Sequence, residues 1–169
     1  VIANLQALAE MSPSYVAARS ASLLRKMLMR GFTTVRDMGG ADFGVAQAIE
    51  EGHLVGPRVL FCGKSFSQSG GHGDMRPPGR TVLDANPWSP AQSRICDGPD
   101  DVARAARDEL RKGAHHIKLM VSGGITSPTD RIDSVQFSIE EISAAVTEAG
   151  AANRYVAGHA YTTRAVNRA

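Results

Sequence analysis

The fold is decided by the stretch His115-His116-Ile117-Lys118-Leu119-Met120-Val121-Ser122-Gly123-Gly124. It lies between segments of helical character, so it is predicted to be a short buried strand that ends in a glycine turn. Because side chains alternate along a strand, one face is expected to pack against helices. That face carries Ile117, Leu119 and Val121, and the opposite face carries His116, Lys118 and Met120. A buried mid-strand lysine is costly unless it is paired, neutralised or chemically modified, so Lys118 is a candidate functional residue.

Helical and strand-like segments alternate on both sides of this stretch. Helices are predicted over residues 13–30, 43–51, 99–112 and 139–150, and further strands over 32–37, 58–62 and 155–160. Strict alternation indicates an α/β fold with a parallel sheet. A complete (β/α)8 TIM barrel needs about 250 residues, so 169 residues with four strands fit the middle of such a barrel. The alternative is a complete small doubly wound domain, against which no G-x-G-x-x-G pattern follows any strand.

Two polar loops follow predicted strands. Residues 63–97 are rich in Gly, Pro, Ser and Asp, and they include the sequence SGGHGD at 69–74 and the only tryptophan, Trp88. Residues 122–136 form a shorter, glycine-containing loop. A loop as long as the first inside a compact domain is usually functional or disordered, so His72 within it is a second candidate.

Composition excludes several classes of protein. The net charge is +2 with scattered basic residues, which argues against a nucleic-acid partner. No apolar run approaches the roughly 20 residues of a membrane span, so no membrane association is expected. Two cysteines are too few for a disulfide framework. The chain starts at Val1, and we expect residues 1–169 to be the central segment of a longer barrel domain.

A histidine near the end of the last predicted strand extends the candidate site. His159 is expected at the carboxyl end of that strand, the end at which parallel α/β folds place their sites. If both inner faces point into a barrel, the Lys118 ammonium and the His159 imidazole lie on neighbouring strands at one rim. The alternatives without a functional role are a structural histidine and a lysine that snorkels or forms an ion pair.

Other polar residues are given structural interpretations. Asp37 is expected to cap a turn, and Cys62 to be a small core residue. His115 faces away from His116 and is not expected to line the site. Solvent-exposed loop charges are expected at Asp130, Arg131 and Asp133.

Five segments in order resemble the amidohydrolase superfamily of metal-dependent hydrolases, and most of all its prolidase-like, imidazolonepropionase-related dipeptidase branch. They are residues 31–37 (GFTTVRD), 56–59 (GPRV), 70–74 (GGHGD), 117–120 with 122–124 (IKLM and SGG), and 158–161 (GHAY). None is specific by itself, whereas the ordered set is. The resemblance implies a partial (β/α)8 barrel covering about strands 2–5 with their helices.

The resemblance also implies a chemistry. Family members hold two divalent metal ions, usually zinc, bridged by a carbamate that forms from CO2 on a strand-four lysine. Lys118 matches that lysine, and His159 matches a strand-five histidine that ligates the second metal, so both are expected catalytic and metal-binding residues. His72 and Tyr161 match family positions near the scissile carbonyl or the substrate carboxylate. The expected substrate is a small amide or dipeptide, and the expected parent is a cytoplasmic homo-oligomer.

The family ligand set is incomplete in this sequence. A His-x-His pair from strand one, a histidine from strand six and an aspartate from strand eight belong to strands outside the chain, so two of six ligands remain, Lys118 and His159. We therefore expect the segment alone to be inactive. Two alternatives stay open: a single-metal deaminase or cyclic-amide hydrolase of the same superfamily, which would lack the lysine carbamate, and a non-catalytic fragment that binds no metal.

Overall fold

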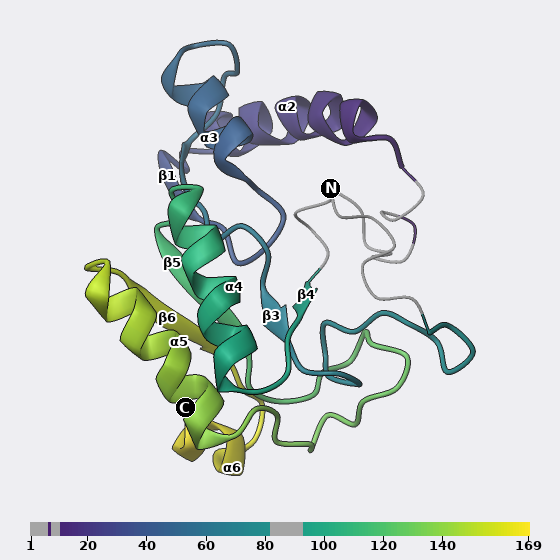
Figure 1. Ribbon diagram of the computed structural model, residues 1–169. Coiled ribbons are helices and arrows are strands. Elements are labelled where there is room, and N and C mark those ends of the chain that lie inside the picture. Colours follow the sequence, from purple (N-terminus) through teal and green to yellow (C-terminus); the bar gives the residue numbers. More distant parts are fainter. Residues whose placement is uncertain (1–6, 8–10, 82–92) are drawn as a thin grey trace.

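The computed structural model describes residue 7 and the ranges 11–81 and 93–169. The expected alternation of helices and strands is present in these ranges (Figure 1). The elements are α2 (Pro13–Met29), β1 (Thr34–Arg36), α3 (Phe43–Glu50), β2 (Arg58–Leu60), β3 (Phe66–Ser67), β4 (Arg94–Ile95), α4 (Pro99–Arg111), β5 (His116–Met120), α5 (Ile139–Ala151), β6 (Tyr155–His159) and α6 (Thr163–Arg168).

The named strands pair in parallel. β1 pairs with β2, β3 with both β4 and β5, and β5 with β6. The amide of His115 donates to the carbonyl of Phe61 at 2.8 Å, so the chain just after β2 also lies beside the start of β5. The named strands form two sheets, with the orders β1-β2 and β4-β3-β5-β6. Apart from the two-residue strand β4 at the edge, neighbouring strands within each sheet follow the order of the sequence, as in a (β/α)8 barrel. The chain forms part of such a barrel.

The expectation of a single irregular loop over residues 63–97 is wrong in part. The segment contributes β3 and β4, whose paired residues are Phe66 with Arg94 and Ser67 with Ile95. Each strand has two residues, too short for an alternating pattern to be visible in the sequence. Phe66 and Ser67 are nevertheless fully buried. Trp88 lies outside the described residues.

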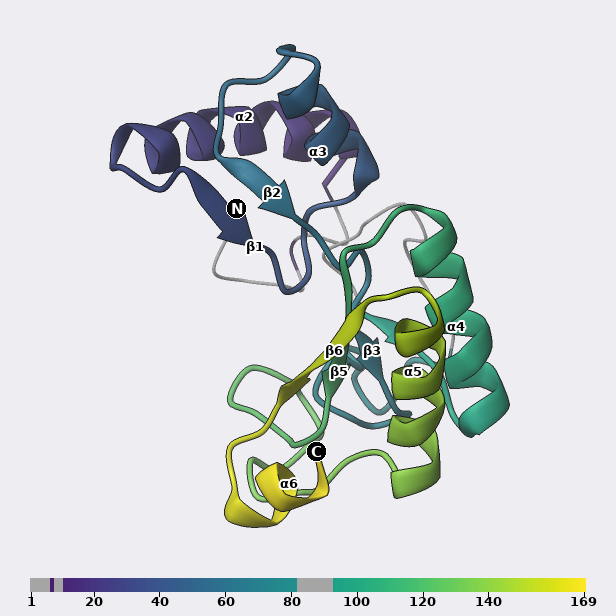
Figure 2. The same ribbon diagram turned by 90° about the vertical axis from the view of Figure 1, so that its left-hand side faces the viewer.

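The main core lies between the sheet and two helices. Figure 2 shows α4 and α5 side by side against one face of β3, β5 and β6. The predicted outward face of β5 is confirmed, because Ile117, Leu119 and Val121 are 0–1% exposed and pack in that core. Their partners include Val102, Ala105 and Ala106 from α4 and Ile142, Ala145 and Ala149 from α5. Because the helix-facing side of β5 is filled by core residues, functional side chains are expected on its opposite face.

A second, smaller core lies under α2 and α3. It gathers Val59, Phe61, Ala46, Ala41 and Ala114. The helices begin where the sequence predicts. Ser138 and Glu141 form a capping box at the start of α5, and the Ser12 hydroxyl accepts from the amide of Tyr15 at the start of α2. Across the described ranges, no helix combines the length and apolar character needed to cross a membrane.

Candidate active site

Lys118 and His159 lie on the same face of neighbouring parallel strands. Lys118 is paired with Ala157, and Met120 with His159, so the histidine stands two residues further toward the carboxyl end of the sheet. The loops after β3 and β5 and the short helix α6 meet at this end in Figures 1 and 2. The sequence placed both residues at one rim of the barrel, and the structure brings them there.

Lys118 is buried without a counter-ion in the described part of the chain. Its side chain donates to the carbonyl of Leu119 at 3.2 Å, and the residue is 6% exposed. The alternatives of a snorkelling or an ion-paired lysine therefore find no support among the described residues. Burial lowers the pKa of the Lys118 ammonium to about 8, because a low dielectric disfavours the charged form. A larger share of neutral amine, the form that reacts with CO2, follows near neutral pH.

The imidazole of His159 lies between two other aromatic rings. It stacks on His72 with centroids 4.6 Å apart and planes 12° apart, and it meets the ring of Tyr161 edge-on at 4.8 Å. Its Nε2 is buried and has no hydrogen-bond partner among the residues that the structure describes. Burial, followed by the charges of Lys118 and His72, lowers the pKa of His159. A neutral imidazole with a free, buried nitrogen is the form that binds metal.

His72 is held by the loop that follows β5. Its amide donates to Oε1 of Gln136 at 2.9 Å, and its Nδ1 lies 3.1 Å from Oγ of Ser127 and 3.6 Å from Oδ2 of Asp130. The ring packs so closely on Gly124 that a Cβ there would overlap it. The loop bearing His72 is therefore held over His159 by residues that could not be identified from the sequence.

The interpretation of Asp130 as a solvated loop charge is wrong. Its side chain is 2% exposed, and Oδ2 accepts from the amide of Gly124 and from Nε2 of Gln136, both at 3.1 Å. The same interpretation is confirmed for Arg131 and Asp133, which form an ion pair with side chains 84% and 59% exposed. In a polar loop, the sequence pattern around a buried aspartate does not differ from that around an exposed one. The nearby Gly124 was the one available hint, since glycine allows close approach.

The remaining candidates from the sequence are Tyr161, Asp37 and Cys62. Tyr161 is half exposed, and its amide donates to Oγ of Ser122 at 3.0 Å. Asp37 caps a turn, as expected, by accepting from the amides of Gly39 and Ala41. Cys62 is fully buried, and burial raises its thiol pKa to about 12, which confirms it as an inert core residue.

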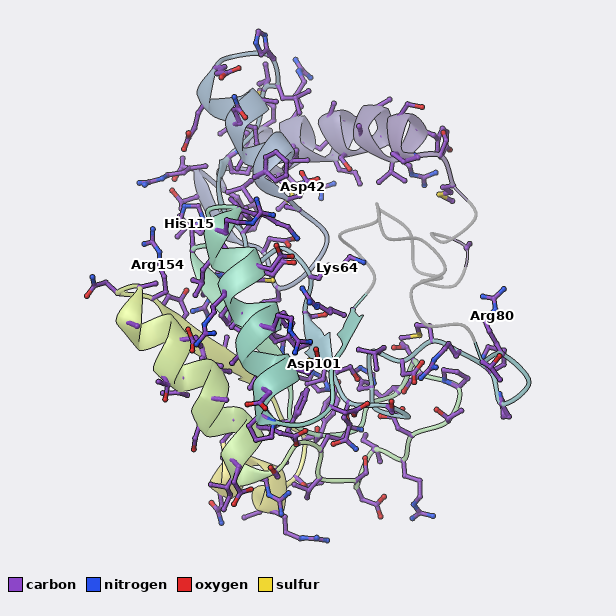
Figure 3. All side chains as sticks on the ribbon, viewed as in Figure 1. Asp42, Lys64, Arg80, Asp101, His115 and Arg154 are labelled. Atoms are coloured by element: carbon purple, nitrogen blue, oxygen red, sulfur yellow. The ribbon has the colours of Figure 1, made fainter. Side chains whose placement is uncertain are left out.

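The two adjacent histidines at the start of β5 lie in different surroundings. His115 has a structural role, since its Nδ1 accepts from the amide of Phe61 at 3.3 Å, and it lies near the junction with the α2–α3 part (Figure 3). His116 is fully buried on the same face as Lys118 and stacks on Tyr155 at 5.3 Å. Within the described ranges, neither nitrogen of His116 has a hydrogen-bond partner. Sequence reasoning placed it on this face and assigned it no role.

The described residues alone do not form a metal site. No group of three or more His, Cys, Asp or Glu side chains among them could hold a metal ion. Lys118 and His159 do fit the requirements of a ligand, since one is a buried amine without a counter-ion and the other offers a buried, unpartnered Nε2. Because a hydrolytic zinc takes at least three protein ligands, these two alone would not hold one.

The sequence matches known proteins along most of its length. The model of the amidohydrolase family matches residues 2–169. An ochratoxinase from Aspergillus niger is 39% identical over an alignment of 158 residues, and the match covers 88% of this chain and 33% of that protein. This chain therefore spans about a third of the length of that relative.

Solved structures give the same result for the fold. A prolidase in complex with N-methylphosphonate-L-proline is 48% identical with a TM-score of 0.93, over 98% of this chain and 41% of that one. An Xaa-Pro dipeptidase with methionine bound in its active site is 29% identical with a TM-score of 0.79, over 94% of this chain and 39% of that one. The likeness confirms the predicted fold, a partial α/β barrel.

Proposed function

This chain belongs to the amidohydrolase family, and from that premise we propose that it is the central part of a metal-dependent hydrolase that cleaves amide bonds in small substrates. The proposed substrates are dipeptides and N-acylated amino acids. The proteins it resembles include a prolidase, an Xaa-Pro dipeptidase and an ochratoxinase. Each of these names denotes a hydrolytic enzyme. The chain covers 33–41% of these relatives, so the activity proposed is that of the whole protein.

One observation carries the proposal. A buried lysine without a counter-ion and a histidine with a buried, unpartnered nitrogen lie on the same inner face of neighbouring strands, at the end of the sheet where α/β barrels place catalysis. Leaving two such groups unpaired is costly in a structural core. Both costs are removed if Lys118 becomes an anion and His159 donates its free lone pair to a cation.

We propose that Lys118 carries a carbamate. The ammonium first loses a proton to water. The neutral Nζ then attacks the carbon of CO2, so that an N–C bond forms as one C=O π bond opens onto oxygen, and a second proton leaves to water. A cation is thereby replaced by a carboxylate-like anion. The carbamate oxygens and Nε2 of His159 would then hold two divalent ions, with zinc as the proposed metal. When bound, these ions supply Lewis acidity to the scissile carbonyl and to the attacking water.

His72 and Tyr161 are proposed to contact the substrate. Both rings touch His159, so a substrate bound at that histidine meets them. Nε2 of His72 can donate to the scissile carbonyl, and the half-exposed hydroxyl of Tyr161 can donate to a substrate carboxylate. Neither residue is a proposed metal ligand.

The experiment uses the full-length protein that contains this chain. Release of amino acid from Xaa-Pro dipeptides and from N-acyl amino acids is measured as prepared, after removal of metal by a chelator, and after return of zinc. The proposal predicts turnover that is lost on chelation and restored by zinc. Undiminished hydrolysis by the metal-free protein would contradict it. A parallel assay offers a heterocycle that carries an amino group, and release of ammonia from it without cleavage of the amide substrates would favour the single-metal deaminase.

A further inference from the structure

Asp130 is a buried carboxylate beside the proposed substrate-contacting histidine. Its side chain is 2% exposed, and Oδ2 lies 3.6 Å from Nδ1 of His72. The same oxygen accepts from the amide of Gly124, on which the His72 ring packs, and from the side-chain amide of Gln136. One carboxylate therefore contacts the ring, the backbone beneath the ring and the side chain that holds the histidine's own amide.

Gln136 transmits the orientation set by Asp130. The Gln136 amide points its Nε2 at Asp130, 3.1 Å away, and its Oε1 at the amide of His72, 2.9 Å away. Nε2 of Gln136 also donates to Oγ of Ser134 at 3.1 Å, but a hydroxyl can donate as well as accept, whereas the Asp130 carboxylate only accepts. Asp130 is therefore the partner that favours the orientation in which Oε1 of Gln136 faces His72. Loss of the carboxylate would weaken that orientation and loosen the loop that carries His72.

A purely structural brace does not require this residue type. Oδ1 of Asp130 is buried and has no hydrogen-bond partner among the described residues, so a carboxyl group lies in the interior with only part of its hydrogen-bonding capacity met. Removing a carboxylate from water to this extent is costly, and a neutral amide oxygen could accept from Gly124 just as well. A charge retained beside an imidazole instead favours a donor N–H on the near nitrogen, Nδ1.

We propose that Asp130 is a positioning residue that holds His72 with Nδ1 turned to the β5 loop and Nε2 available to the substrate carbonyl. Ser127 completes the arrangement, with Oγ 3.1 Å from Nδ1. Asp130 acts through His72 and touches neither substrate nor metal. This inference rests on the proposed function, since it assigns a task to His72 in amide hydrolysis.

A double-mutant cycle in the full-length protein tests the inference. The variants are D130A, H72A and the double variant, with D133A as the matched control, because Asp133 is an exposed aspartate of the same loop. D130A is expected to lower kcat about 10- to 100-fold, with KM and bound metal changed less than about twofold. In the H72A background the same change is expected to have no further effect on kcat. D133A is expected to match the wild type.

A second readout does not depend on activity. In the metal-free protein, D130A is expected to raise amide hydrogen exchange at His72 and its neighbours in residues 68–74, and D133A is not. D130N keeps an acceptor for Gly124 and serves in the same cycle if D130A does not fold. It is expected to preserve the low exchange of that loop and still to lower kcat, because the charge beside Nδ1 is lost.

The outcomes separate the two proposals. If H72A lowers kcat but the effect of Asp130 multiplies with it, or exchange in residues 68–74 is unchanged, Asp130 has no positioning role and the proposed function stands. If H72A keeps wild-type kcat, the task assigned to His72 is wrong, and the positioning role falls with it.

Discussion

Gly124 gives the sharpest test of where His72 must lie. A Cβ added at this position would overlap Cε1, Nδ1 and Nε2 of the His72 ring. Gly124 is absent from the residues with positive φ, so alanine is compatible with the backbone there. The substitution Gly124→Ala therefore acts through the ring alone, with no added backbone strain.

The size of the effect follows from the geometry. Non-bonded carbon atoms settle about 3.5–4.0 Å apart, so the imidazole must retreat by more than about 1 Å to admit the methyl group. A misplacement of about 1 Å in a reacting site can cost about 100-fold in rate, or roughly 2.7 kcal/mol of transition-state stabilisation. We expect kcat/KM of the full-length protein to fall by about this factor.

Steady-state kinetics and elemental analysis measure the result. Metal content is expected to stay at the wild-type level, because the three atoms nearest to the added methyl group all belong to His72. Gly150→Ala is the matched control. Gly150 lies in α5 with no atom within 4 Å of an added Cβ, and alanine there should stabilise the helix by about 0.5–1 kcal/mol. Wild-type kcat/KM in the Gly124→Ala variant would refute the position and the task given to His72.

Three further predictions concern stability and assembly. Asp108→Asn should cost about 1 kcal/mol at pH 7 after solvent screening. The ammonium of Lys112, followed by the guanidinium of Arg111, lowers the Asp108 pKa to about 2 in the folded state. The carboxylate's contribution is therefore full above about pH 4 and fades as the pH falls toward 2. Urea unfolding across that range should show the two proteins converging, and a constant difference would argue against the ion pairs as its cause. Leu119→Ala should lower the free energy of unfolding by about 3 kcal/mol, because Leu119 is 1% exposed in the main core; a loss under about 1 kcal/mol would contradict that packing. Expressed alone, residues 1–169 should bind less than one zinc per chain and self-associate, since β1 and β6 each pair on one side in the described ranges; light scattering that shows a monomer, with stoichiometric zinc by elemental analysis, would overturn this.

The periodicity of apolar residues and the signals at helix ends predicted most of the helices and strands. The alternation around Lys118 separated a helix-packed face from an inner face, and burial of Ile117 and Leu119 confirms the separation. Such patterns are local, so they can be read from a single sequence. β3 and β4 could not be read, because two paired residues leave no period and their pairing joins segments 28 residues apart, Phe66 with Arg94.

The candidate site was predictable only where a strand fixes the direction of a side chain. Lys118 and His159 met at one rim because strand register determines their faces. The partners of His72 come from a loop, and loop contacts follow no period. Asp130 and Gln136 reach His72 across 58 and 64 positions of sequence, through hydrogen bonds that depend on the folded path of residues 122–136. Apart from the nearby Gly124, the sequence offers no sign that Asp130 is buried and Asp133 exposed.

The metal content of the Lys118→Ala variant tests the central claim most directly. In the full-length protein, elemental analysis of the wild type should find about two divalent ions per chain, and the alanine variant should lose them together with amide hydrolysis. Lys26→Ala, at an exposed lysine of α2, serves as the control and should behave as the wild type. Added propionate should restore part of the metal and of the activity to Lys118→Ala, because its carboxylate can take the place of the carbamate. Full metal content with wild-type hydrolysis in Lys118→Ala would contradict the account.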